Sequence, residues 1–132
     1  MRCWIAAVPV ALAASVSFSI AVPARAEAPL VDHTEWVSLA GRPSLRVYPT
    51  PAGRAAAARL DTDDDAAWRE VLTAAPDADT PGMREQFRCH WDYAELAQPG
   101  KTSWNLEPWR PVVDEVTMLE TGCNPGGPEE TF

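Results

Sequence analysis

Cys89 and His90 are neighbours in this chain, and they are the residue types of a thiolate nucleophile and its general base. Neighbouring positions do not by themselves give catalytic geometry, because the reacting groups must meet in space. The sequence also offers Cys89 a different role, since Cys123 follows it in the same half of the chain. Which role applies depends on the compartment in which the protein works.

The first 26 residues have the order of a secretory signal peptide. Arg2 gives a positive start, an uncharged and largely apolar stretch runs to Val22, and Ala24-Arg25-Ala26 places small residues where a signal peptidase cuts. We expect cleavage after Ala26 and a secreted, extracellular bacterial protein. An uncleaved membrane anchor is the alternative, because the uncharged run approaches the ~20 residues that span a bilayer.

Export also determines which cysteines remain in the protein and whether they are oxidised. Cys3 leaves with the signal peptide, and Cys89 and Cys123 remain as the pair that an oxidising compartment joins. A bridge that closes a loop of this length stabilises a fold by roughly 3–4 kcal/mol in the chain-entropy model. We therefore expect a structural disulfide at Cys89 rather than a reactive thiol.

The charge balance narrows the range of partners. Arg2 and Arg25 leave with the signal peptide, so nine basic residues remain against 19 acidic ones, a formal charge of −10. Such a surplus disfavours binding to nucleic acid and to anionic lipid. Nothing after residue 26 has an apolar run long enough to cross a membrane, so no membrane contact is expected once the signal is cleaved.

The remaining chain predicts a single small α+β domain with one disulfide. Residues 27–35 form a polar lead-in, residues 36–125 form the domain, and residues 126–132 form a flexible acidic tail. Two short alternating runs around residues 40–43 indicate an N-terminal β-hairpin. The prolines in residues 49–53 are then expected to interrupt regular structure.

About three helices are expected to pack with this hairpin. The first has apolar residues at i, i+3, i+4 and i+7 from Trp68, and it ends before Pro76. The second opens at Thr80 and carries the cysteine–histidine pair, and the last follows Pro111 and ends at Gly122. The apolar face of the last helix comprises Val112, Val113, Val116 and Leu119.

A group of aspartates precedes the first of these helices. Asp61, Asp63 and Asp65 have the spacing of the first three ligands of an EF-hand calcium loop. That loop also needs a glycine in sixth place and a glutamate in twelfth, where this chain has Ala66 and Leu72. Helix capping is therefore the favoured role of the aspartates, and we expect no metal site and no cofactor.

The most informative segment is Trp104-Asn105-Leu106-Glu107-Pro108-Trp109-Arg110-Pro111. Its two prolines exclude a helical conformation from the residues before them, which predicts a stiff extended loop. On such a loop four side chains are candidates for binding, namely Trp104, Glu107, Trp109 and Arg110. In the alternative interpretation, the rings fill the core of a small domain and Glu107 pairs with Arg110.

Two functions are compatible with these residues. The first is a secreted binding module that presents residues 104–111 to an extracellular protein, peptide or glycan. The second is a small secreted hydrolase in which His90 acts as general base and Glu107 or Asp92 orients it. The binding module is favoured, because the sequence has no nucleophile elbow, P-loop, dinucleotide fingerprint or C-x-x-C motif.

Three parts of the chain together resemble the family called domain of unknown function 2599. They are Phe87-Arg88-Cys89-His90, Lys101-Thr102-Ser103 running into the tryptophan-rich segment, and Cys123-Asn124-Pro125. The resemblance covers residues 36–125. It implies export from high-GC Gram-positive bacteria, and it supplies no established activity, cofactor or catalytic residue.

Overall fold

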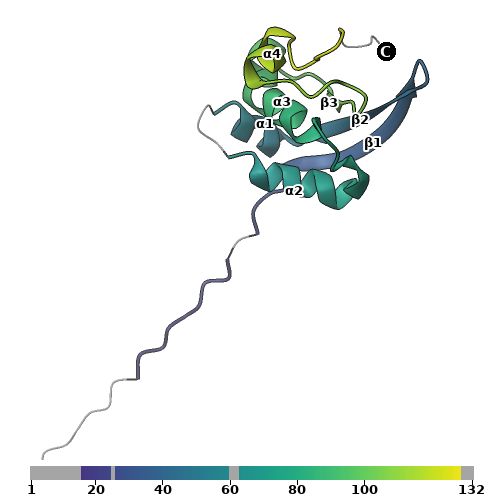
Figure 1. The fold of residues 1–132 in the computed structure, drawn as a ribbon. Coiled ribbons are helices and arrows are strands. Elements are labelled where there is room, and N and C mark those ends of the chain that lie inside the picture. The colour runs from purple at the N-terminus through teal and green to yellow at the C-terminus, as the bar shows by residue number, and fades with distance from the viewer. Residues whose placement is uncertain (1–15, 25, 60–62, 129–132) are drawn as a thin grey trace, which may run out of the picture.

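The computed structural model describes residues 16–24, 26–59 and 63–128 (Figure 1). Residues 16–24 run away from the domain as an extended and exposed segment. The beginning of the predicted signal peptide, and Arg25 within its cleavage site, lie outside the described residues. Within the described part, none of the helices combines the length and the apolar character needed to span a bilayer.

The domain combines one antiparallel sheet with helices that pack on it (Figure 1). The strands, hydrogen-bonded in this order, are β1 (Val31–Leu39), β2 (Arg42–Pro49) and β3 (Trp104–Leu106). The helices are α1 (Pro51–Ala57), α2 (Asp65–Ala74), the 3-10 turn η1 (Pro76–Ala78), α3 (Met83–Ala97) and α4 (Glu115–Glu120). The predicted small α+β domain with an N-terminal hairpin is confirmed.

The hairpin starts earlier in the chain than the sequence suggested. Val31 already pairs with Pro49, so β1 includes residues that were expected to form a polar lead-in. The main-chain N–H groups of Leu30 and Val31 donate to one carboxylate oxygen of Glu70 on α2, at 2.9 and 2.8 Å. This contact between residues far apart in the sequence fixes the start of β1. No local sequence pattern predicts the contact.

Helix α1 begins where the prolines were expected to interrupt regular structure. Thr50 Oγ1 accepts the Gly53 N–H at 2.9 Å, and Pro51 occupies the first turn, where its missing N–H has no cost. A β-carbon at Gly53 would overlap the Leu30 carbonyl oxygen. The absence of a side chain at this glycine lets α1 pack against the segment that leads into β1.

Helices α2 and α3 have the apolar faces that the sequence predicted, but the start of each helix differs from its prediction. Asp64 does not cap α2 with its side chain, because its carboxylate pairs with Arg84 of α3. Asp63 does accept the Asp65 N–H at 2.8 Å, which is a local turn contact. Asp64 belongs to the group of aspartates before α2 that was expected to cap the helix, and for Asp64 this expectation is wrong. Helix α3 begins at Met83, later than the predicted start.

An aromatic cluster fills the core between the sheet and the two longer helices. Phe87 of α3 has its ring centroid 5.4 Å from that of Trp68, 6.3 Å from that of Trp91 and 6.1 Å from that of Trp104. Trp91 and Trp104 meet edge to face at 6.2 Å. Such pairs contribute ~0.5–1.5 kcal/mol each beyond the burial of their surface. For Trp104 the core-packing interpretation therefore holds.

Helix α4 departs furthest from its prediction. It spans only Glu115–Glu120 and is capped by the side chain of Asp114. Three residues of the predicted apolar face, Val112, Val116 and Leu119, are 63%, 65% and 48% exposed. Met118 is buried instead and packs with the two cysteines. The last helix is therefore shorter than predicted, and most of its predicted apolar face lies at the surface.

Gly122 ends α4, as the sequence predicted. The Gly122 N–H donates to Leu119 O and the Cys123 N–H to Met118 O, both at 3.0 Å, which is the Schellman pattern of helix ends. Gly122 has a φ of +59°, a conformation that glycine adopts without strain. This ending carries Cys123 to Cys89 of α3, with a Cα–Cα distance of 5.6 Å, and the predicted disulfide is confirmed.

Replacing Phe87 with alanine is expected to lower the free energy of unfolding by about 3–5 kcal/mol, because three indole rings lose their common contact. Urea unfolding followed by tryptophan fluorescence measures the loss. Leu96→Ala on the same helix is the control, since Leu96 is 58% exposed and its truncation is expected to cost within about 0.5 kcal/mol. Equal losses in the two variants would contradict a core centred on Phe87.

Candidate functional site

The tryptophan-rich segment lies inside the domain rather than along its surface. Its first residues form β3, where Leu106 pairs with Leu45 of β2. The chain then turns at residues 107–110, and the Arg110 N–H donates to the Glu107 carbonyl at 3.2 Å. Pro108 occupies the second position of this turn, which its fixed φ favours. The segment is thus half strand and half turn, and not the uniformly extended loop that was expected.

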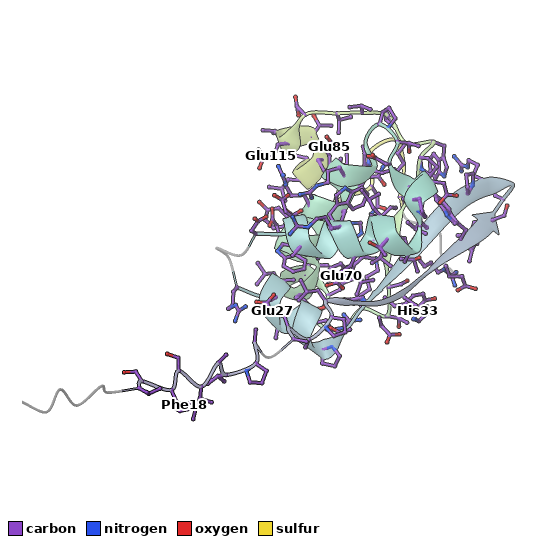
Figure 2. The ribbon with its side chains drawn as sticks, turned by 90° about the horizontal axis from the view of Figure 1, so that it is seen from below. Phe18, Glu27, His33, Glu70, Glu85 and Glu115 are labelled. Carbon is purple, nitrogen blue, oxygen red and sulfur yellow. A yellow bond between two sulfur atoms is a disulfide. The ribbon has the colours of Figure 1, made fainter. Side chains whose placement is uncertain are left out.

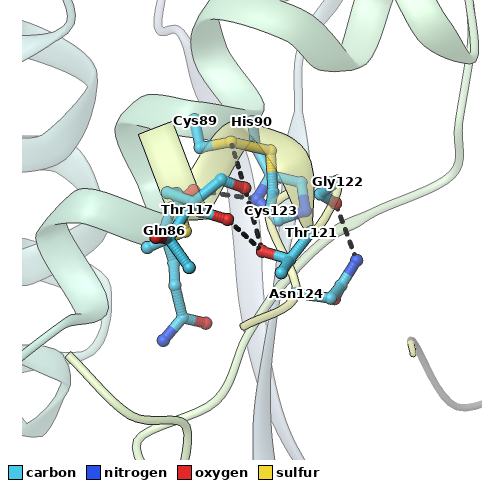
Figure 3. Close-up of a disulfide and its surroundings, with 9 residues drawn as sticks. Gln86, Cys89, His90, Thr117, Thr121, Gly122, Cys123 and Asn124 are labelled. Carbon is cyan, nitrogen blue, oxygen red and sulfur yellow. Dashed lines mark hydrogen bonds between the residues drawn. A yellow bond between two sulfur atoms is a disulfide. The ribbon is translucent and has the colours of Figure 1, made fainter. Parts of the chain in front are cut away.

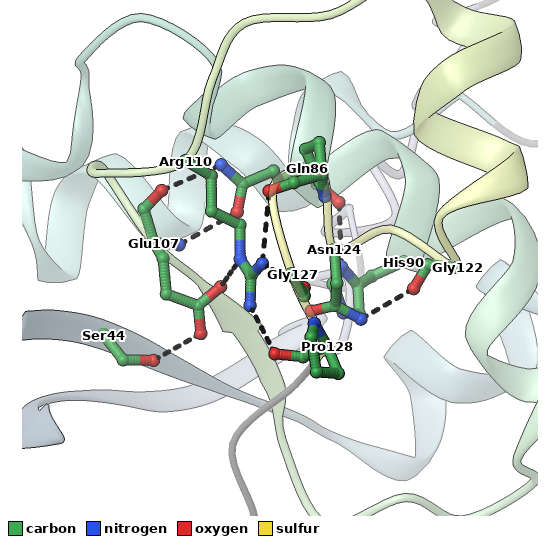
Figure 4. A network of polar contacts seen from close by, with 10 residues as sticks. Ser44, Gln86, His90, Glu107, Arg110, Gly122, Asn124, Gly127 and Pro128 are labelled. Atoms are coloured by element: carbon green, nitrogen blue, oxygen red, sulfur yellow. Dashed lines mark hydrogen bonds and ion pairs between the residues drawn. The ribbon is translucent and has the colours of Figure 1, made fainter. Parts of the chain in front are cut away.

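The turn brings two buried charges together (Figure 4). Arg110 Nε donates to Glu107 Oε2 at 2.7 Å, and the Ser44 hydroxyl of β2 donates to Glu107 Oε1 at 2.9 Å. Glu107 is 4% exposed and Arg110 is 3% exposed. Buried charges are tolerated when they are paired and hydrogen-bonded. Of the two roles that the sequence left open for these residues, internal pairing is the one observed.

Main-chain carbonyls of the C-terminal segment complete the surroundings of Arg110 (Figure 4). One terminal nitrogen donates to Pro125 O at 3.2 Å and to Gly127 O at 2.6 Å, and the other lies 3.5 Å from Pro128 O. The beginning of the predicted flexible tail is therefore bound to the domain. Residues 129–132 of that tail lie outside the described residues.

Gln86 of α3 binds the main chain of the same turn. Its side-chain amide donates to Glu107 O and accepts from Glu107 N–H, both at 2.9 Å, as a neighbouring strand would. The sequence analysis missed Gln86 and Ser44. A single glutamine on a helix, or a single serine on a strand, belongs to no motif, and only the fold shows what it touches.

His90 is buried, and the residues suggested for hydrolysis occupy different surroundings. His90 Nδ1 donates to the Gln86 main-chain carbonyl at 2.9 Å, one helical turn earlier. Glu107 has both carboxylate oxygens bonded, as described above. Asp92 follows His90 by two positions, which rotates it by about 200° around the helix axis, and it lines a surface hollow with Glu115. The proposed base and its orienting acids are not assembled into one constellation.

Trp109 is the member of the candidate binding set that reaches the surface, being half-buried. The guanidinium carbon of Arg42, an exposed residue at the start of β2, lies 3.9 Å from the centroid of the Trp109 ring. The guanidinium carbon of Arg110 lies 4.5 Å from the same ring. The indole is thus held by cation–π contacts to the hairpin and to the buried ion pair.

The disulfide packs against α4 (Figure 3). Cys89 and Cys123 form a small buried cluster with Met118, and Tyr93 and Val113 pack against it. With its sulfur in the bridge, Cys89 has no thiolate to offer as a nucleophile.

The aspartates ahead of α2 are paired with an arginine. Their carboxylate oxygens, on Asp63, Asp64 and Asp65, lie within 4.8 Å of one another. Arg84 binds Asp64 and also Asp65, the latter at 2.6 Å, and the hydrogen bond that Arg84 donates to Asp64 is the main cause that raises the pKa of Arg84. The Arg84 guanidinium places its positive charge beside these carboxylates, where a bound calcium ion would place its own. Asp61 lies outside the described residues.

These features define a class of protein: a small α+β domain with one disulfide, built around a buried glutamate–arginine pair. The chain belongs to the family described as "Protein of unknown function (DUF2599)", whose family model matches residues 31–126. The match begins at the first residue of β1. The resemblance inferred from the tryptophan-rich segment is confirmed.

Relatives of this chain occur in mycobacteria. An uncharacterised protein of Mycobacterium tuberculosis is 65% identical over 104 residues, which cover 78% of this chain and 70% of that protein. An uncharacterised protein of Mycobacterium leprae is 50% identical over 99 residues, which cover 74% of this chain and 80% of that protein. No solved structure matches the chain.

Replacing Arg110 with alanine is expected to lower the free energy of unfolding by about 3–5 kcal/mol, because Glu107 would keep its burial and lose its countercharge. Urea unfolding of the Arg110→Ala, Glu107→Ala and double variants measures both the loss and the coupling between the two residues. The coupling is expected to lie at about 0.5–3 kcal/mol.

The matched control is Arg88→Ala, because the Arg88 side chain is 60% exposed. That change is expected to alter the free energy of unfolding by no more than about 0.5 kcal/mol. Strictly additive losses at positions 107 and 110 would show that the pair does not act as a unit.

Proposed function

We propose that this protein is a secreted binding module whose contact surface includes Trp109 and Arg42. One observation carries the proposal: an exposed guanidinium stacks 3.9 Å above a half-buried indole. Tryptophan and arginine are the residue types that most often carry the binding energy of protein interfaces. Of the four candidate binding side chains that the sequence singled out, Trp109 is the one that the fold leaves available to a partner.

The turn beneath this surface favours binding because it is held from several sides. Trp109 lies between Pro108 and Arg110, and Arg110 is fixed by Glu107 and by the C-terminal carbonyls. A side chain on such a base has little freedom to lose when a partner arrives. The buried residues of the segment thus serve binding indirectly, by positioning the residue that makes contact.

The charge around the surface favours a partner of a particular kind. Arg42 and Arg46 are four positions apart on β2, so they project from the same face of the strand. This places local positive charge within a domain whose formal charge is −10 after removal of residues 1–26. We therefore infer an extracellular protein or peptide that offers a carboxylate beside an apolar group; a glycan is the competing ligand.

The proposal includes export. Mass spectrometry of the protein recovered from culture medium is expected to give a chain that begins at Glu27 and lacks the two hydrogens that a disulfide removes. Reduction should restore those two hydrogens. Recovery of a chain that still begins at Met1, held in the membrane fraction, would contradict both the cleavage and the secreted location.

Substitution of the surface residues is expected to abolish binding without unfolding the domain. A partner is first captured by cross-linking in culture medium, identified and purified, and its Kd is then measured by calorimetry. Trp109→Ala and Arg42→Ala are each expected to weaken binding by about 2 kcal/mol, or about 30-fold. Thermal unfolding checks that each variant remains folded.

Trp36→Ala is the matched control for this experiment. Trp36 pairs with Leu45 across the hairpin, so these two side chains project from the same face. Arg42 lies three positions from Leu45 on β2, so Arg42 projects from the opposite face. Removal of the Trp36 side chain is expected to leave the Kd unchanged. Binding that survives both surface substitutions, or tight binding of an oligosaccharide without a protein partner, would overturn the proposed surface or its partner class.

A further inference from the structure

A hollow of about 110 Å³ lies between α3 and α4, on a part of the surface that does not include Trp109. Its floor is apolar and is formed by Cys89 of the disulfide together with Tyr93, Val113, Met118 and Leu119. Its rim is charged and is formed by Glu85, Arg88, Asp92 and Glu115. The volume suits one side chain, whereas pockets for small molecules usually enclose about 300–1,000 Å³.

Negative charge predominates at the rim. The three carboxylates are those of Glu85, Asp92 and Glu115, and Figure 2 shows Glu85 and Glu115 on the same side of the molecule. Within the described part of the chain, no hydrogen bond or ion pair holds any of the three. Arg88 brings the one positive charge of the lining, and its Nε lies 3.8 Å from the Asp64 carboxylate.

Asp92 is a rim carboxylate whose surroundings disfavour its charge. Its pKa is raised above the ordinary value, first by burial and then by the negative charges of Asp64 and Glu115. Arg88 and Arg84 act in the opposite direction without cancelling this effect. A cation brought close to Asp92 would therefore gain more from the contact than it gains from a fully hydrated carboxylate.

Exposed apolar side chains adjoin the hollow. Val116 and Leu119 of α4 are 65% and 48% exposed, and they belong to the apolar face that the sequence predicted for the last helix. Leu119 and Tyr93 also line a second, neighbouring hollow of about 650 Å³, which includes Leu96. The hollow thus lies within a longer apolar strip that crosses the surface of α3 and α4.

We propose that the hollow between α3 and α4 binds an arginine or lysine side chain of an extracellular protein or peptide. The methylene groups of that side chain lie on Met118 and Cys89, and its charged end meets the rim carboxylates, as long basic side chains do at apolar surfaces with a polar edge. Apolar residues next to it in the partner cover Val116 and Leu119.

The charge of the domain argues against a second copy of this chain as the occupant. At a formal charge of −10 after removal of residues 1–26, two copies repel each other. The same charge draws a basic segment toward the domain and speeds its association. This site and the Trp109 surface are separate, so either can fail without the other.

The test uses the mature, disulfide-bonded protein and synthetic hexapeptides with blocked ends. The first peptide alternates Arg with Leu, the second alternates Glu with Leu, and the third alternates Arg with Ser. Two-dimensional NMR is expected to show binding of the Arg–Leu peptide, with shifts centred on Tyr93, Met118 and Leu119. The Arg–Ser peptide is expected to bind more weakly, and the Glu–Leu peptide not at all.

Asp92→Asn is the diagnostic variant, and Glu120→Gln is its matched control. Both remove one negative charge, from α3 and from α4 respectively, but Glu120 does not line the hollow. Asp92→Asn is expected to lower the affinity for the Arg–Leu peptide about fivefold, and Glu120→Gln less than about twofold. Trp109→Ala, which changes the other surface, is expected to leave this affinity unchanged.

The affinity should also depend on pH. Because the pKa of Asp92 is raised, its charge is lost earlier than that of an ordinary aspartate as the pH falls. Binding of the Arg–Leu peptide is expected to weaken as the pH falls from neutral, and this weakening is expected to be smaller in Asp92→Asn. Equal binding of the Arg–Leu and Glu–Leu peptides, equal effects of the Asp92 and Glu120 variants, or shifts that map elsewhere would each overturn the proposal.

Discussion

The buried pair of Glu107 and Arg110 is the constraint on which the rest of the structure depends. An arginine side chain keeps its charge in proteins, so a buried one must find acceptors for its N–H groups. The carboxylate of Glu107 supplies one acceptor, and the carbonyls of Pro125 and Gly127 supply others. Ser44 and Gln86 then bind Glu107, which draws β2 and α3 to the same point.

The disulfide depends on this arrangement and supports it. Cys123 begins the segment whose carbonyls surround Arg110, and the bridge to Cys89 anchors that segment to α3. The bridge also fixes which side of α4 faces inward. Met118 packs on the cysteines, and Val116 is left at the surface as a consequence. The exposed apolar strip that we propose as a docking site is therefore a result of the same geometry that secures the core.

Much of the fold could be predicted from the sequence because its signals are local. The alternating runs indicate the hairpin, the spacing from Trp68 indicates α2, and Gly122 marks the end of α4. The disulfide could be predicted by counting cysteines, since only Cys89 and Cys123 lie outside the predicted signal peptide. Each of these inferences needed no knowledge of contacts between distant residues.

The features that escaped prediction all depend on such distant contacts. Glu70 extends β1 by binding Leu30 and Val31 across the domain, and Arg84 takes Asp64 away from its expected capping role. The tryptophan-rich segment shows the same limit in the candidate site. Trp, Glu and Arg are equally suitable for a binding surface and for a buried network. Only the burial of each side chain, which the sequence does not give, shows which role it has.

The central claim is that Arg110 is sealed within this network, and hydrogen exchange at its Nε–H group tests that claim most directly. Nitrogen-15 NMR of the mature protein at neutral pH is expected to show a resolved Arg110 Nε–H resonance that exchanges far more slowly than that of Arg88, whose side chain is 60% exposed. The protection is expected to disappear in Glu107→Gln. An Arg110 Nε–H group that exchanges as fast as that of Arg88 in the folded protein would contradict the account.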